Sequence, residues 1–470
     1  MDAIQSGRSI ATLYTPTPLL YSTSMSKQAG CNIWLKLENM QPTQSFKIRG
    51  VGSMCINALA EQSAQRLVVI GDTNAALTVA YSARQLGVPA TVFVPASNGP
   101  VPVIRSKIEL EGADIVEEGR SIKDAYDAAR AFAKATDGAV IIDTADDAVA
   151  VAGNATIVAE INVQLQRREP IVVVAPVGSG GLLSGLISGL HQNLWNHVPV
   201  IAVETHNTST FQRALLLDSE STGAGSKAAA TNGGRRSTTG KSKLSVLQEP
   251  PPSTPPPSLL PPFEEDVDVD CDPKTALSSS RSGARSDSES LSYHCSRGRV
   301  LGDSRATEPT VATCLSVGSV CTKALELSRA HPVVPISISE AMAAEACRRF
   351  LDDHQMLIEV GSAAALSVVG KGLVHQIIPD LGHNSHVVVV VTGGANINFD
   401  RLDSYRQRFP YPAPIIAKSG QEIFMRMLDA TQSTSTSGLL SSSNVIASTP
   451  GQQRPPPPPT STASMVSTPL

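Results

Sequence analysis

The sequence is poor in aromatic residues and has neither a disulfide-like cysteine pattern nor an apolar run that could cross a membrane. Its 470 residues include only 9 Phe, 7 Tyr and 2 Trp. The 7 Cys form no CxxC pair, and their odd number and wide scatter fit a reducing compartment better than a disulfide framework. The longest purely apolar run, 387–391, is far shorter than the roughly 20 residues needed to span a bilayer.

An excess of charge of one sign is also missing. Lys and Arg number 38 against 42 Asp and Glu, which gives a formal net charge of −4. This balance provides no broad basic field for nucleic acid or for an anionic membrane surface, so we expect a small-molecule or protein partner. The first segment, MDAIQSGRSIATLY, has no basic region followed by an apolar core. We therefore expect no secretory signal, and a cytoplasmic protein.

Two segments have a composition that does not favour folding. Residues 217–311 and 419–470 hold about half of the prolines and long Ser/Thr-rich stretches. Such segments bury too little apolar surface to offset the entropy of ordering them, so we predict a disordered insertion and a disordered tail. The run EPPPSTPPPSLLPPF in the insertion is either a ligand for an SH3 or WW type of partner or a tolerated expansion of a surface loop.

The remaining residues alternate between strand and helix patterns. Apolar strands separated by amphipathic helices predict an α/β fold with parallel-rich sheets that helices cover on both faces. The expected strands are 67–70, 91–94, 115–116, 140–142, 171–175, 200–203 and 386–391. The expected helices are 75–86, 103–110, 121–135, 154–166, 182–190 and 339–353.

Two short motifs could carry chemistry. The turn Gly178-Ser179-Gly180-Gly181 follows the strand IVVVAP and opens a helix, an arrangement that lets backbone N–H groups surround a phosphate. It is neither a GxGxxG fingerprint nor a P-loop, and it is equally compatible with a merely tight turn. Lys47, in PTQSFKIRG, is flanked by apolar residues. Desolvation there would leave its amine free to form a Schiff base with an aldehyde cofactor.

Taken together, these motifs resemble the fold-type II pyridoxal-phosphate enzymes. The runs PTQSFKIRG, AYSARQLGVPATVFVP, VGSGGLL, IAVET and VVTGGANI occur in the family's order, and they are most similar to the serine dehydratase and threonine deaminase group. The resemblance implies a tryptophan synthase β-like structure in which pyridoxal phosphate lies between two domains. We expect 1–50, 150–216 and 312–418 to form the large cofactor-binding domain and 51–149 the small domain.

The resemblance also implies roles for single residues. Lys47 would form the Schiff base and move the substrate's Cα proton, and Phe46 would pack beside the ring. The expected phosphate-binding residues are Gly178, Ser179, Gly180 and Gly181. Asn74 matches the asparagine that binds the cofactor's phenolic oxygen, and Thr392 the hydroxyl residue that faces the pyridine nitrogen. A neutral hydroxyl there suits elimination over transamination.

One loop departs from the family pattern. The segment that usually reads Ser-Ser/Ala-Gly-Asn is here Gly71-Asp72-Thr73-Asn74, and we predict that these four residues and Ser45 bind the substrate. Asp72 or Thr73 is a good helix N-cap that would occupy N–H groups needed by the substrate carboxylate. Asp72 either points away from the cleft, or acts as a second acid as in a serine racemase, or weakens catalysis. Residues 359–363, EVGSA, also differ from the family's Glu-Pro-Ala-Cys/Ser-Gly, which indicates a moved active-site wall.

The resulting hypothesis is a pyridoxal-phosphate-dependent L-serine and L-threonine ammonia-lyase that forms a homodimer. The alternatives are a catalytically weakened docking scaffold and a serine racemase or β-replacement enzyme of the same fold. No metal site is predicted, although Glu204 matches a position near a cation site in parts of the family. Cys314 and Cys321 are expected to be core residues.

Overall fold

The computed structural model describes residues 12–71, 73–96, 103–143, 146–227, 310–419 and 422–426. These residues form one sheet of eight strands and one of four. Helices connect most successive strands, as expected for parallel pairing. The predicted α/β class with parallel-rich sheets is confirmed.

The eight-stranded sheet is parallel in its centre. In order across the sheet, its strands are β1 (Leu19–Tyr21), β2 (Asn32–Leu37), β10 (His386–Val391), β7 (Val172–Pro176), β8 (Val200–Thr205), β9 (Val333–Ile338), β11 (Ile415–Ser419) and β12 (Glu422–Arg426). Pairing is parallel from β2 to β9 and antiparallel at β1, β11 and β12. The central strands are nearly continuous apolar runs, because both of their faces are buried.

The four-stranded sheet is entirely parallel. Its order is β5 (Asp114–Glu117), β4 (Ala90–Val94), β3 (Arg66–Ile70) and β6 (Ala139–Ile141). Ligands bind at the carboxyl ends of the strands in such sheets, so the turn after β3 is the first place to look for a site on this side.

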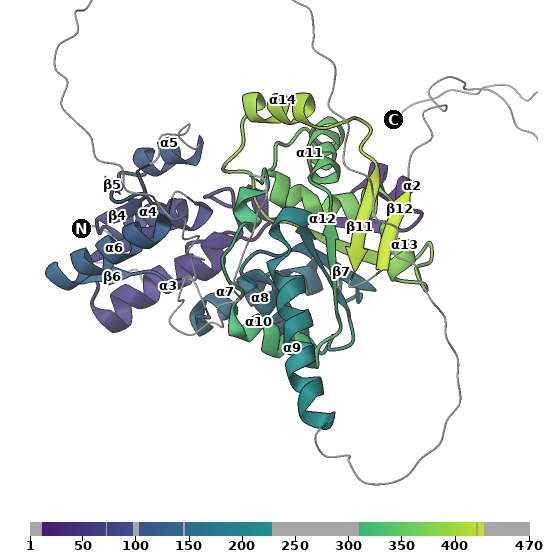
Figure 1. Ribbon diagram of the computed structural model, residues 1–470, viewed down its shortest axis with the longest axis horizontal. Coiled ribbons are helices and arrows are strands. Elements are labelled where there is room, and N and C mark those ends of the chain that lie inside the picture. Colours follow the sequence, from purple (N-terminus) through teal and green to yellow (C-terminus); the bar gives the residue numbers. More distant parts are fainter. Residues whose placement is uncertain are drawn as a thin grey trace, which may run out of the picture. The chain divides into compact units, whose positions relative to one another are not determined.

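The longer helices connect these strands or cover the sheets. They are α2 (Thr23–Ala29), α3 (Lys47–Gln62), α4 (Asn74–Leu86), α5 (Val103–Leu110), α6 (Ile122–Ala135), α7 (Ala148–Gln164), α8 (Gly181–Gln192), α9 (Thr210–Lys227), α10 (Thr322–Ala330), α11 (Glu340–His354), α12 (Val360–Gly370), α13 (Leu373–Ile377) and α14 (Phe399–Arg408). Short 3-10 turns η1 (Glu38–Met40), η2 (His206–Thr208) and η3 (Thr313–Leu315) complete the order. Figure 1 shows α3 to α6 around the four-stranded sheet at one side, and α8, α10 and α12 beside the eight-stranded sheet.

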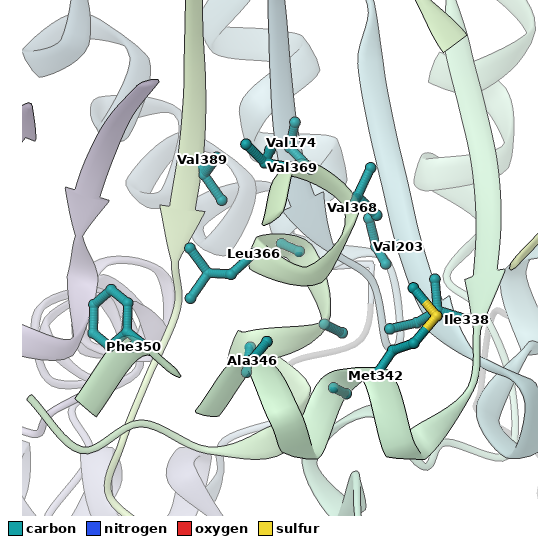
Figure 2. Packing of buried hydrophobic residues seen from close by; sticks show 14 of the residues in the cluster. Val174, Val203, Ile338, Met342, Ala346, Phe350, Leu366, Val368, Val369 and Val389 are labelled. Carbon is teal, nitrogen blue, oxygen red and sulfur yellow. The ribbon is translucent and has the colours of Figure 1, made fainter. Parts of the chain in front are cut away.

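The largest core cluster lies between the eight-stranded sheet and helices α11 and α12. In Figure 2, Leu366, Val368 and Val369 of α12 lie between the strands and α11. The valines of the strands and the side chains on the inner face of α11, such as Met342, Cys347 and Phe350, are almost completely buried there. On the opposite face of the sheet, α7 and α8 bury a second cluster. Two covered faces hold the central strands, and the loops at their carboxyl ends, in place.

A buried ionic cluster fixes the start of α3. The Arg49 guanidinium, which is fully buried, pairs with Glu38 at 2.7 Å and with Glu160 of α7 at 2.7 Å. Lys36 of β2 is also fully buried and pairs with Glu160 at 2.5 Å. Two cations and two carboxylates balance one another in this cluster. Because Arg49 is two residues from Lys47, the cluster anchors the helix turn that carries this lysine.

Most predicted elements are confirmed, and regular structure extends beyond the predicted ranges at three places. The helix expected at 154–166 begins earlier, at Ala148. Helix α9 runs to Lys227, past the predicted end of the domain at 216, and strand β12 lies in the predicted tail, where it pairs with β11. Local composition does not predict β12, because it does not register pairing with an existing strand. The rest of the predicted insertion and tail, with the proline-rich run, lies outside the described residues.

Candidate active site

A cavity of about 390 Å³ brings most of the predicted site residues together. Among the residues that line it are Ser45, Phe46, Lys47, Thr73, Asn74, Gly178, Ser179, Gly180, Gly181 and Thr392. Gly71 follows β3 with a positive φ of 85° and is not in the lining, and Asp72 lies outside the described residues. The two sheets contribute unequally: Thr73 and Asn74 follow β3, whereas Lys47, the glycine turn and Thr392 lie on the side of the eight-stranded sheet.

Lys47 is the first residue of α3 and reaches into this cavity. Its Nζ lies 5.3 Å from the centre of the Phe46 ring. Burial lowers the pKa of the Lys47 amine, and the thiols of Cys314 and Cys321 oppose this shift only in part. No carboxylate among the described residues forms an ion pair with Lys47. The side chain therefore has what a Schiff-base lysine requires: a desolvated amine that no neighbouring carboxylate holds in its charged form.

The glycine turn leaves the N-terminus of α8 open. Gly180 is the N-cap, with φ 93°, and no side chain caps the helix. A Cβ at Gly180 would lie 2.5 Å from the Cβ of Ala324, and one at Gly178 would lie 3.3 Å from the carbonyl of Cys314. The turn therefore needs glycine at 178 and 180 for close packing, and the first N–H groups of a twelve-residue helix remain available to an anion at the cavity wall.

The N-terminus of α4 is capped by its own chain. Thr73 is the N-cap, and its hydroxyl accepts a hydrogen bond from Ala76 N at 3.4 Å. The prediction that Asp72 or Thr73 caps this helix is thus confirmed for Thr73. Asn74 Nδ2 donates to Glu359 Oε1 at 2.9 Å, while Asn74 Oδ1 is buried without a partner. Asn74 Oδ1 can therefore accept a hydrogen bond from a bound group.

Thr392 follows β10 and is locked to the lysine segment. Phe46 N donates to the Thr392 carbonyl at 3.0 Å, and Ser45 bridges to Gly393. Ser362 Oγ accepts from Thr392 N at 2.8 Å and from Gly393 N at 3.3 Å. The Thr392 side chain is 7% exposed and lines the cavity, so its hydroxyl is a neutral group at this wall.

Two polar side chains that line the cavity, Glu359 and Ser362, had no assigned role in the sequence analysis. Glu359 accepts from Asn74 and from Asn396 N, both at 2.9 Å, and Ser362 holds the turn after β10. Both lie in the EVGSA segment, where the departure from the family pattern was the only signal. Cys314 was expected in the core, which is wrong: the residue is exposed and lines the cavity, whereas Cys321 is buried. The Cys314 thiol itself is enclosed beside Glu359, and this burial raises its pKa well above the ordinary value. Nothing in the local sequence distinguishes the two cysteines, because their difference arises from tertiary packing.

Glu204 lies outside the cavity lining and has a capping role. Its carboxylate accepts from Phe211 N at 2.8 Å and from Gln212 N at 2.9 Å, at the start of α9. Burial raises the pKa of Glu204 to about 7, although these two hydrogen bonds oppose the shift. No cluster of three or more His, Cys, Asp or Glu that could hold a metal occurs in the described parts of the chain.

The donor set of the cavity fits pyridoxal phosphate. An open helix N-terminus suits the phosphate, a desolvated lysine suits the aldehyde, and an aromatic ring and an incompletely bonded amide lie beside them. All of these features are formed by backbone and side-chain groups of this chain. The cavity thus provides complementary groups for every polar end of that cofactor.

Comparison with known proteins defines the class. A profile of the family described as "Pyridoxal-phosphate dependent enzyme" matches residues 10–252. This chain belongs to that family. The family profile does not extend to Glu359 and Thr392, which lie later in the chain.

Particular relatives narrow the class. The chain is 30% identical over 405 residues to the human L-serine dehydratase/L-threonine deaminase, which covers 84% of this chain and 95% of the relative. It is 24% identical to the L-serine dehydratase of Dictyostelium discoideum, over 87% of this chain and 96% of the relative. A fungal L-serine ammonia-lyase from Rhizomucor miehei is 31% identical with a TM-score of 0.62, over 85% of this chain and all of that structure. The predicted resemblance to the serine dehydratase group is confirmed. A maize serine racemase, at 18% identity and a TM-score of 0.57, shares the fold.

Proposed function

We propose that this protein is an L-serine and L-threonine ammonia-lyase that uses pyridoxal phosphate. The observation that carries the proposal is the Lys47 amine, desolvated and free of any carboxylate ion pair among the described residues, in the same cavity as the open N-terminus of α8. The similarity to serine dehydratases over most of the chain supports the choice of reaction.

Pyridoxal phosphate, when bound, supplies the aldehyde and the electron sink that make the substrate's Cα proton removable. The N–H groups of Gly178 to Gly181 would hold its phosphate, and Phe46 would pack beside the ring. Asn74 would orient the cofactor through its amide. Thr392 would offer the ring nitrogen only a neutral hydroxyl, which would moderate the electron sink and favour elimination.

Lys47 carries the proton transfer. Because burial lowers its pKa, a larger fraction of the amine is unprotonated at neutral pH, and the free amine can remove the Cα proton. Ser45 and the backbone N–H groups of Thr73 and of the first turn of α4 would place the substrate carboxylate, and the positive φ of Gly71 forms the turn before them. Asp72 belongs to the same turn by sequence. The substrate then loses its β-hydroxyl as water, and hydrolysis of the resulting enamine gives pyruvate from serine or 2-oxobutanoate from threonine, with ammonia.

The larger organisation is part of the proposal. We infer a large cofactor-binding domain built on the eight-stranded sheet and a small domain built on the four-stranded sheet, with the cavity between them. We also infer a homodimer in the cytoplasm. The odd number and wide scatter of the cysteines, which form no CxxC pair, support this location. In the described residues no helix has both the length and the apolar character to cross a bilayer.

The test is keto-acid release from L-serine and L-threonine by the purified protein with added pyridoxal phosphate, beside Lys47→Ala. We expect release by the wild type and a loss of at least about a thousandfold in the variant. The ratio of the two rates gives the substrate preference. A wild type that binds the cofactor through Lys47, as seen in its absorption spectrum, but releases no keto acid would contradict the proposal and favour the docking scaffold.

A second candidate rests on the capped N-terminus of α4. Because Thr73 already satisfies Ala76 N, a substrate carboxylate must compete for that donor. This favours a slow enzyme or one with an altered amino-acid substrate. Measuring D-serine formation in the same assay tests the racemase alternative, and measuring cysteine formation after addition of sulfide tests the β-replacement alternative.

A further inference from the structure

A lysine of helix α5, on the side of the four-stranded sheet, donates hydrogen bonds to two segments of the candidate site. Lys107 Nζ donates to Gln44 Oε1 at 2.8 Å and to the carbonyl of Ala395 at 2.7 Å. Gln44 lies three residues before Lys47, and Ala395 three residues after Thr392. Lys107 itself does not line the cavity, so its contacts with both segments lie outside the cavity.

These two segments are already joined to each other. Phe46 N donates to the carbonyl of Thr392, and Gly394 N to that of Gln44, both at 3.0 Å. Ser45 and Gly393 form a β-bridge between the same segments. The segments 44–47 and 392–395 therefore behave as one unit, and a single contact to this unit fixes both the lysine and the hydroxyl at the cavity wall.

The same unit is tied to the four-stranded side at two further points. Ala395 is fully buried in a core cluster that includes Ile104 and Ile108 of α5, the helix that carries Lys107. Asn396 N donates to Glu359 Oε1, which also accepts from Asn74 Nδ2. The Lys107 contact thus lies where the segment that follows β10 meets the side of the molecule that carries the substrate turn.

We propose that Lys107 is a positioning residue that holds the unit of segments 44–47 and 392–395 in register with the substrate turn at the start of α4. The inference takes its amino-acid substrate from the proposed function. The contacts of Lys107 that support it are independent of that function. Lys107 contacts neither substrate nor cofactor. It acts through Gln44 and Ala395, so that an amino acid held at Thr73 and Asn74 presents its Cα to Lys47.

The experiment compares Lys107→Met with Arg105→Met in the holoenzyme. Methionine keeps most of the apolar stem and removes the three donors. Arg105 lies on the same helix but pairs with Glu117 and Glu109, away from both segments, so it is a matched control. The readouts are KM and kcat for L-serine, bound cofactor, and the alkylation rate of Cys314 by iodoacetamide, followed by peptide mass spectrometry. Cys314 lines the cavity and reports its opening without any need for turnover.

We expect Lys107→Met to raise KM about tenfold or more and to speed alkylation of Cys314 by a similar factor, because two charge-assisted hydrogen bonds are lost. Arg105→Met should stay within about twofold of the wild type, and Lys107→Arg should recover most of the loss. Equal behaviour of the methionine variants in KM and alkylation would overturn the proposal. If Lys107→Met does not fold, the decision passes to Lys107→Arg and Lys107→Gln.

The two proposals fail separately. A wild type that releases no keto acid contradicts the ammonia-lyase function. The alkylation rates of the same variants still decide whether Lys107 holds the two sides of the cavity together.

Discussion

Two helix N-termini face the same cavity, and they differ in what satisfies their free N–H groups. At α8 the cap is Gly180, which has no side chain, so the N–H groups remain available. At α4 the cap is Thr73, whose hydroxyl accepts from Ala76 N. The open terminus matches the family pattern, and the capped one is where the sequence departs from it. The N–H groups at the start of α8 can therefore bind an anion directly. At the start of α4, a substrate carboxylate must compete with the Thr73 hydroxyl for an N–H group.

A third terminus completes the comparison. Helix α9 begins with two N–H groups bonded to the buried carboxylate of Glu204. Here the protein itself provides the anion that α8 leaves to a ligand. One fold therefore shows an open, a hydroxyl-capped and a carboxylate-capped helix start, and each can be tested by one substitution.

The largest effect is expected from closing the open terminus. Gly180→Ala places a Cβ 2.5 Å from the Ala324 Cβ, at a φ of 93° that alanine disfavours. The turn must shift, so cofactor affinity should fall about a hundredfold, equivalent to roughly 2.7 kcal/mol. Gly181→Ala is the control, because its Cβ meets nothing within 4 Å. Titration of the cofactor-free proteins with pyridoxal phosphate measures both, and equal affinities would remove the steric argument.

The next effect is a change in the pH dependence of stability. The pKa of Glu204 is raised by burial to about 7 in the folded protein, above its ordinary value near 4.5. The fold therefore favours the protonated form, and its contribution is complete below about pH 4.5 and lost as pH rises through 7. Glu204→Gln keeps an acceptor without the charge, so stability relative to the wild type should improve by about 2 kcal/mol between pH 5 and 8. Urea unfolding across this range measures the difference, and parallel curves for the two proteins would contradict the buried-carboxylate account.

The smallest effect is expected at the hydroxyl cap. Thr73→Ala removes a 3.4 Å hydrogen bond, which should cost about 0.5 to 1 kcal/mol of stability. It also frees Ala76 N, so KM for L-serine should fall severalfold. Ser339→Ala is the control, because Ser339 caps α11 through a similar 3.3 Å bond and does not line the cavity. A fall in KM shared by both variants would show that loosening of the fold, rather than the freed donor, is responsible.

The sequence predicts the central strands and helices well because their residues carry the periodic signal. The strands β3, β4, β7, β8 and β10 are buried runs of Val, Ile and Ala. Lys47 and the glycine turn are also visible, since a lysine between apolar residues and a strand-glycine-helix turn have few structural uses. Short edge strands such as β1 and β11 have no comparable signal.

The residues that the sequence does not predict depend on distant contacts. Lys107 reaches a carbonyl 288 residues away, and the exposure of Cys314 to the cavity depends on where the chain returns after residues 228–309. Glu359 joins Asn74 to Asn396 across the site. No local pattern encodes such pairings, because each requires both segments to be in place first.

The ionic cluster around Arg49 has a consequence for how this chain can vary. Its four charged side chains share hydrogen bonds, so replacing any one of them leaves an opposite charge uncompensated in the interior. This should lower the free energy of unfolding by about 3 to 5 kcal/mol. We therefore expect Lys36, Glu38, Arg49 and Glu160 to vary as a block, either kept together or exchanged together for an apolar set. A library that randomises only one of these positions should return the parent residue, whereas one that randomises all four should also yield uncharged solutions.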